Sequence, residues 1–277
     1  MSETTPLVDL DAYFRRIGWE GPRRADTATL RGLHLAHARS VPFENLEALR
    51  LRAPSLAPDD LMAKLVHSRR GGYCHEQNLL FSYVLEALGF RVTRLVARVV
   101  LGADRIESRP RGHMILLVTA ADDPRPYLAD VGYGAAGALL EAVPLVSGTE
   151  LHDAGRRHRF VHAPHSGPSE LWVLEAYDRV GDEWVAQYVF TLEPFELCDY
   201  EVLNWEVATN PRSPFTRRLF AQRTTSDGHL LLEGRLLTET GADGTVRKRE
   251  LAGEAEVRQV LDADFGITVP DGMTLSL

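Results

Sequence analysis

Cysteine and lysine are both scarce in this chain of 277 residues. The two cysteines, Cys74 and Cys198, lie far apart in the sequence, and nothing marks the chain for export. We therefore expect free thiols rather than a disulfide, with Cys198 packed in the core. Lys64 and Lys248 are the only lysines, so nearly all positive charge is arginine. This bias is typical of a GC-rich bacterial genome and indicates no mechanism.

Long apolar runs and an excess of positive charge are also missing. No run of about 18 apolar residues could span a bilayer, and the N-terminus has no basic region followed by an apolar one. The sequence predicts a cytoplasmic protein without a membrane partner. The net charge of −8 and the absence of a basic cluster argue against a nucleic-acid partner.

The composition is that of a globular enzyme, with 44% hydrophobic and 25% charged residues. Apolar spacing predicts helices at 9–17, 27–39 and 58–67, and another that begins at Cys74 and ends before Gly89. After Gly89 the pattern changes to short strands. We expect these strands at 92–100, 114–118, 127–131, 171–176 and 185–192.

The last part of the chain has a mixed pattern. We expect a helical stretch from about Ser213, two strands flanking the turn at 241–244, and a final helix over 254–265. The predicted domains are therefore a helical bundle (1–90), an antiparallel sheet or barrel (91–203) and an α/β segment (204–277). The fold class is α+β.

Cys74 follows Gly71 and Gly72 and begins an amphipathic stretch. A helix N-terminus carries about half a positive charge, which favours a thiolate over a thiol. We expect the glycine pair to allow a tight turn that leaves the sulfur uncovered. The pattern predicts a cysteine nucleophile at residue 74.

A cysteine nucleophile needs a base, and the base needs a group that fixes its tautomer. His113 opens a buried strand, and Asp130 lies near the end of the next one. A hairpin turn centred between Ala121 and Asp122 would place His113 directly opposite Asp130. Geometry thus selects these two residues to complete a triad with Cys74.

At this point the chain resembles the arylamine N-acetyltransferases, which acetylate arylamines, arylhydroxylamines and hydrazines from acetyl-coenzyme A. The resemblance rests on an ordered set of segments, together highly specific. They are Val41–Leu46 (VPFENL), Arg70–Asn78 (RGGYCHEQN), His113 with its apolar strand and Leu128–Gly134 (LADVGYG), with weaker matches at 190–194 and 210–215.

The resemblance implies the same triad, a cysteine-protease-like core with a C-terminal α/β lid, and a ping-pong reaction through an acetyl-cysteine. It also implies further roles: Arg70 and Glu44 as a structural ion pair, Phe43 as a wall of the acceptor pocket, and the Gly132–Tyr133–Gly134 turn near coenzyme A. Acetyl-coenzyme A is the implied co-substrate and a small amine the acceptor. One departure stands out, since His75 occupies a position that is usually bulky and apolar in the family.

Other interpretations stay open. The same triad order would suit a cysteine hydrolase or transglutaminase-type enzyme, and the same scaffold serves amide synthases that release polyketide chains. A catalytically dead binding module is a further alternative. The cluster His152, His158, His162 and His165 lacks the spacing of a metal site and predicts a solvated loop, so we expect no metal.

Overall fold

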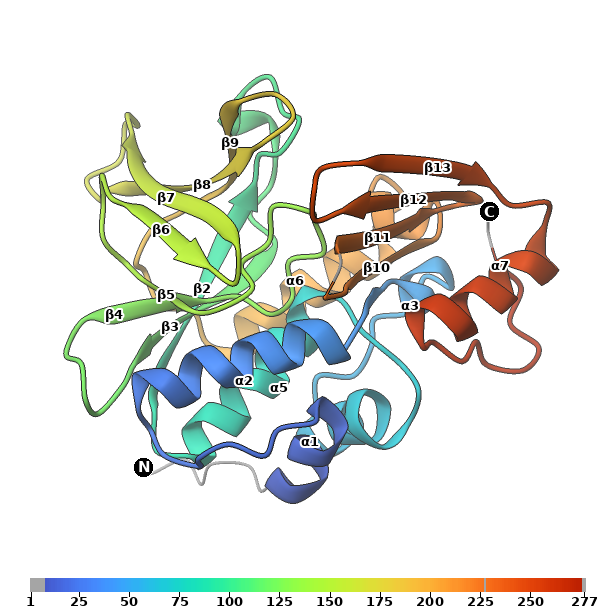
Figure 1. The fold of residues 1–277 in the computed structure, drawn as a ribbon, viewed down its shortest axis with the longest axis horizontal. Helices are drawn as coiled ribbons and strands as arrows, with labels where there is room; N and C mark the ends of the chain where they lie inside the picture. Colours follow the sequence, from blue (N-terminus) through green and yellow to red (C-terminus); the bar gives the residue numbers. More distant parts are fainter. Residues whose placement is uncertain (1–7, 227, 276–277) are drawn as a thin grey trace.

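The computed structural model describes residues 8–226 and 228–275. It has an N-terminal group of helices, an eight-stranded antiparallel sheet that nearly closes into a barrel, and a five-stranded C-terminal sheet (Figure 1). The predicted α+β class, with its bundle, barrel and α/β segment, is confirmed. The domain boundaries 1–90, 91–203 and 204–277 remain predictions.

Local signals place the helices well. In α1 (Leu10–Ile17) the Asp9 side chain accepts a hydrogen bond from the Ala12 amide, and Gly18 ends the helix with a φ of 66°. The others are α2 (Thr27–Ser40), α3 (Leu46–Leu49), α4 (Pro58–Leu61), α5 (Cys74–Ala87), α6 (Leu197–Thr209) and α7 (Glu254–Val260). Two π-helical segments, Met62–His67 and Leu261–Phe265, extend α4 and α7.

The barrel strands follow the order β5-β4-β3-β2-β9-β8-β7-β6. Helix α5 packs against β2 and β3, which places the start of α5 beside the start of β3. The strand bounds are β2 (Arg91–Val99), β3 (His113–Thr119), β4 (Pro126–Ala129), β5 (Val143–Pro144), β6 (Glu150–Asp153), β7 (Arg156–Ala163), β8 (Leu171–Asp178) and β9 (Glu183–Phe190).

The C-terminal sheet is joined to the N-terminal part by β1 (Phe43–Glu44), which pairs with β10. Its apolar face packs with α7 around residues such as Leu232, Leu261 and Phe265. The order is β1-β10-β11-β12-β13, with β10 (Phe220–Thr224), β11 (Gly228–Glu233), β12 (Leu236–Gly241) and β13 (Val246–Glu250).

Three sequence predictions are wrong. The supposed solvated loop around the histidine cluster is the β6–β7 hairpin, in which His158 is fully buried. Only the short 3₁₀ turns Ile106–Ser108 and Pro214–Thr216 lie in their regions, so no longer helix starts at Ser213. Cys198 is exposed because α6 turns Tyr200 and Asn204 inward instead.

The described helices were also compared with the dimensions of a bilayer. Over residues 8–226 and 228–275, none combines the length and apolar character that a membrane crossing requires.

Candidate active site

Cys74 is the first residue of α5, where backbone N–H groups lack partners within the helix. The Glu76 side chain accepts a hydrogen bond from the Tyr73 amide at 3.2 Å and so fixes the helix start. The Cys74 side chain is only 5% exposed, and its Sγ lies 3.9 Å from the Gly112 carbonyl oxygen. The expectation of an uncovered sulfur is therefore wrong.

The glycine pair serves close packing rather than exposure. A Cβ on Gly71 would lie 2.0 Å from the Pro42 carbonyl oxygen, and one on Gly72 would lie 2.8 Å from Glu76 Oε2. Neither glycine has a positive φ within the described residues. These glycines let the segment before Cys74 lie directly against β1 and the helix start.

His113 and Asp130 meet beside α5. His113 Nε2 lies 2.7 Å from Asp130 Oδ2, and Asp130 Oδ1 accepts hydrogen bonds from Asn78 Nδ2 at 2.9 Å and the Gly132 amide at 3.1 Å. All of these groups are buried. The carboxylate is thus held on both oxygens.

The predicted hairpin register is wrong, although the two side chains meet. Leu117 pairs with Leu128, so the turn is centred one residue later than predicted and His113 is a diagonal neighbour of Asp130. Moving the centre by one residue shifts the pairing by two. The strand repeat is also two, so the face is preserved and diagonal neighbours remain within reach.

The environment favours an ionised pair. Burial alone would lower the pKa of His113, but the charge and hydrogen bond of Asp130, together with contact with Cys74, raise it to about 10. Burial alone would raise the pKa of Asp130, but the charge and hydrogen bond of His113 lower it overall. An imidazolium beside the Cys74 sulfur would favour a thiolate.

This shift predicts a pH-dependent stability. The folded pKa of His113, about 10, lies above the model value of 6.5, so its contribution is fully present below pH 6.5 and is lost as pH rises through about 10. Urea unfolding from pH 6 to pH 10 should show a steeper loss of stability in the wild type than in His113→Phe. Equal pH dependence in both proteins would contradict the ion pair.

The residues implied for substrate binding line one cavity. Phe43, Gly132, Tyr133 and Gly134 surround it together with Asp130. A Cβ on Gly132 would lie 2.7 Å from Cys74 Cα, so only glycine fits there without a shift. The cavity is lined further by Ala38, Val41, Gln77, Val131, Ala138, Leu139, Gln222, Arg223, Thr224 and His229.

Sequence reasoning did not identify the wall from β10 and β11. Arg223 and His229 lie about a hundred residues beyond Asp130, and only the β1–β10 pairing brings them to the cavity. Burial, and then the charge of Arg156, lower the pKa of His229 to about 3, so its imidazole is neutral. No local pattern marks either residue, so the sequence alone could not have found this wall.

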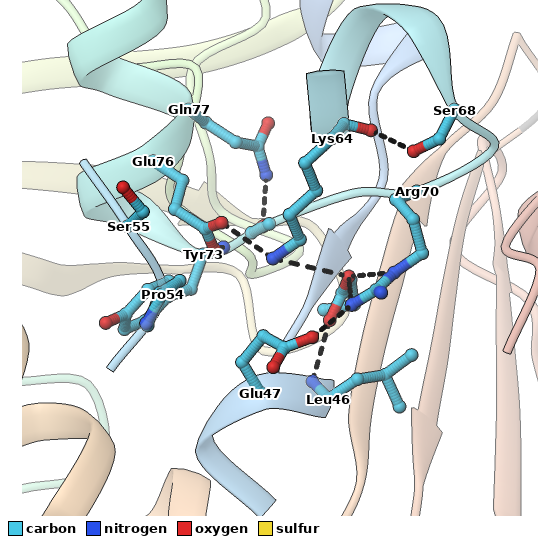
Figure 2. A network of polar contacts seen from close by, with 12 residues as sticks. Leu46, Glu47, Pro54, Ser55, Lys64, Ser68, Arg70, Tyr73, Glu76 and Gln77 are labelled. Carbon is cyan, nitrogen blue, oxygen red and sulfur yellow. Dashed lines mark hydrogen bonds and ion pairs between the residues drawn. The ribbon is translucent and has the colours of Figure 1, made fainter. Parts of the chain in front are cut away.

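A buried network of charges supports the segment before Cys74 (Figure 2). Arg70 Nη2 lies 2.7 Å from Glu44 Oε1, as the resemblance implied, and 3.4 Å from Glu47 Oε1. Burial alone would raise the pKa of Glu44, but the charges of Lys64 and Arg70 lower it overall. The pair ties β1 to the loop that precedes α5.

Lys64 is a second cation that the sequence analysis passed over. Its Nζ lies 2.6 Å from Glu76 Oε1 and 3.7 Å from Glu44 Oε1, and both carboxylates are about 1% exposed. Figure 2 shows the Lys64 side chain pointing toward Glu76 from the π-helical segment. Its rarity was the available signal, since one of only two lysines is buried.

His75 lies away from the cavity, fully buried between Tyr73 and Tyr200 with ring centroids 5.4 Å and 6.1 Å away. Neither ring nitrogen has a hydrogen-bond partner of good geometry among the described residues. Burial, and then the charge of His113, lower its pKa to about 3, so the imidazole is neutral.

We expect His75→Phe to stabilise the protein. The substitution keeps the aromatic contacts and removes an unpaired polar group, whose burial costs about 1–3 kcal/mol. For a chain of this size the melting temperature should rise by a few degrees, about 2–4 °C per kcal/mol. A lower melting temperature would show that the imidazole has a polar partner in solution.

Comparison with known proteins places this geometry in a family. The N-acetyltransferase family model matches residues 26–273. An arylamine N-acetyltransferase of Mycolicibacterium smegmatis is 38% identical over 271 residues, covering 95% of this chain and 94% of the relative.

Solved structures agree. The Nocardia farcinica arylamine N-acetyltransferase has a TM-score of 0.88 at 43% identity, covering 95% of this chain and 90% of that one. The Mycobacterium marinum enzyme, solved in complex with CoA, has a TM-score of 0.86 at 36% identity, covering 94% and 93%. The chain therefore belongs to the arylamine N-acetyltransferase family.

Proposed function

We propose that this protein transfers an acetyl group from acetyl-coenzyme A to an arylamine, arylhydroxylamine or hydrazine, in a ping-pong reaction through an acetyl-cysteine at Cys74. The observation that carries the proposal is the 2.7 Å contact between His113 and Asp130 beside the first residue of α5. Family membership supports acetyl transfer to arylamines.

In the first half-reaction the Cys74 sulfur attacks the thioester carbonyl carbon. Backbone N–H groups at the start of α5 stabilise the oxyanion, a contribution of about 3–4 kcal/mol per donor. The bond between the acetyl carbon and the coenzyme A sulfur then breaks. His113 protonates the departing thiolate and is left neutral.

In the second half-reaction the amine attacks the acetyl-cysteine. Neutral His113 accepts the proton that the amine loses, while Asp130 keeps the imidazole in place. The carbon–sulfur bond to Cys74 breaks and the thiolate and imidazolium are restored. Arylamines suit this step because they are unprotonated near neutral pH.

The cavity lining supports binding of the two substrates. Arg223 carries the charge that a phosphate of coenzyme A would need, and the backbone of Gly132 and Gly134 is open to close approach. Phe43 packs against Phe215, with ring centroids 5.7 Å apart, and offers an apolar surface for an aromatic acceptor. The M. marinum relative solved with CoA adds weight to this donor.

Initial rates with both substrates varied test the proposal. Acetyl-coenzyme A and a panel of arylamines and hydrazines should give parallel double-reciprocal plots and one acetylated amine per coenzyme A released. Release of acetate without amine product would favour a hydrolase. Turnover only with a long acyl thioester would favour an amide synthase.

A further inference from the structure

Three buried polar side chains outside the cavity have no part in the reaction described above. His34 lies on α2, Asp153 ends β6 and His158 lies in β7, and all three are fully buried. They converge on the backbone of residues 137–141, which follows the Gly132–Gly134 turn. The structure links this segment to Asp130.

The His34 contacts fix its tautomer. Nε2 accepts a hydrogen bond from the Asp130 amide at 2.9 Å, so Nδ1 carries the proton and donates to the Leu140 carbonyl at 2.9 Å. Strand β4 ends at Ala129, so the Asp130 amide bonds to this imidazole rather than to a neighbouring strand. The backbone position of Asp130 therefore depends on His34.

Asp153 and His158 hold the other end of this connection. Asp153 Oδ2 accepts hydrogen bonds from the Leu140 amide at 2.5 Å and the Glu141 amide at 3.3 Å. His158 Nδ1 lies 2.9 Å from Asp153 Oδ1 and Nε2 lies 3.0 Å from the Gly137 carbonyl oxygen. Both partners are acceptors, so His158 needs both ring protons to satisfy them, and its charge pairs with Asp153.

We propose that His34, Asp153 and His158 are positioning residues for Asp130, acting by fixing segment 137–141 and, through His34, the backbone of Asp130. The inference rests on the proposed function in one respect, that Asp130 orients His113. Small displacements of such a group are costly, because a catalytic arrangement must hold to within about 0.5 Å.

Variants at His34 separate its two contacts. His34→Phe removes both, whereas His34→Gln keeps an acceptor at the position of Nε2 and loses the donor to Leu140. Thr29→Val is the matched control, since it lies on the same helix, is buried, and its hydroxyl has no hydrogen-bond partner among the described residues. At the far end, Asp153→Asn can still accept from the Leu140 amide, whereas Asp153→Ala cannot.

The first readout is the pKa of His113, measured in the full chain by NMR of labelled histidine rings and assigned with His113→Gln. It needs no substrate. We expect a lower pKa in His34→Phe, a smaller drop in His34→Gln and Asp153→Ala, and no change in Thr29→Val. The second readout is the rate of Cys74 acetylation, which should fall at least tenfold in His34→Phe with little change in the KM for acetyl-coenzyme A.

The two readouts distinguish failure of this inference from failure of the proposed function. A wild type that never acetylates Cys74 would contradict the function, while the His113 titration would still decide the role of His34. An unchanged pKa of His113 in a folded His34→Phe protein would overturn the inference. Should His34→Phe not fold, an unchanged pKa in both His34→Gln and Asp153→Ala would overturn it equally.

Discussion

Replacing Cys74 by alanine should abolish release of coenzyme A. Removing the nucleophile leaves no atom to accept the acetyl group, and loss of one member of such a constellation costs about four to six orders of magnitude in rate. The fold should persist, because alanine fits the first position of α5 and Cys74 Sγ makes only a weak contact with Gly112. Thiol release from acetyl-coenzyme A with saturating arylamine measures the effect.

Cys198→Ala provides the control. This second thiol is exposed on α6, so its loss should leave the rate unchanged. Coenzyme A release at more than about a hundredth of the wild-type rate in Cys74→Ala would contradict covalent catalysis through this residue, because a covalent route has no substitute nucleophile.

Replacing Lys64 by methionine should give the largest loss of stability. Methionine keeps most of the apolar stem but leaves Glu76 as a buried carboxylate without a cation, which costs about 3–5 kcal/mol. Glu44 keeps its contact with Arg70, so the effect acts mainly through Glu76. Urea unfolding at pH 7 measures the loss, and the expected fall in melting temperature is about 6–20 °C.

Two further variants make this prediction sharp. Lys248→Met changes the only other lysine, which is exposed on β13, and should leave stability unchanged. Adding Glu76→Gln to Lys64→Met should restore much of the loss, because glutamine can still accept from the Tyr73 amide without carrying a charge. A stable Lys64→Met protein, or no recovery in the double variant, would show that the charge network is not what holds this region.

Much of the fold follows from local signals. The helix boundaries at Asp9, Gly18 and Gly89 depend on capping and on φ, which are properties of a few adjacent residues. The hairpin β6–β7 was missed because Asp153 and His158 are polar and inward-facing. Each neutralises the other inside the barrel, so the usual apolar alternation is absent.

The site divides in the same way. Cys74, His113 and Asp130 could be selected because a glycine pair and a short turn mark them. Their exact pairing was misjudged, because a turn can shift its centre by one residue without changing which face is buried.

The supporting residues could not be found in the sequence. His34 reaches Asp130 from α2, and Lys64 reaches Glu76 from the π-helical segment, contacts that exist only after the chain has packed. The cavity wall from Arg223 and His229 depends on the β1–β10 pairing in the same way. Such contacts leave no periodicity for a sequence to display.

The most direct test mixes the full chain with acetyl-coenzyme A, stops the reaction with acid and maps tryptic peptides by mass. Cleavage after Arg70 and Arg91 isolates Cys74 from Cys198. The account predicts one acetyl group on peptide 71–91, and its loss to an added arylamine. Turnover without acetyl on this peptide, or an acetyl group at another residue that the arylamine removes, would contradict it.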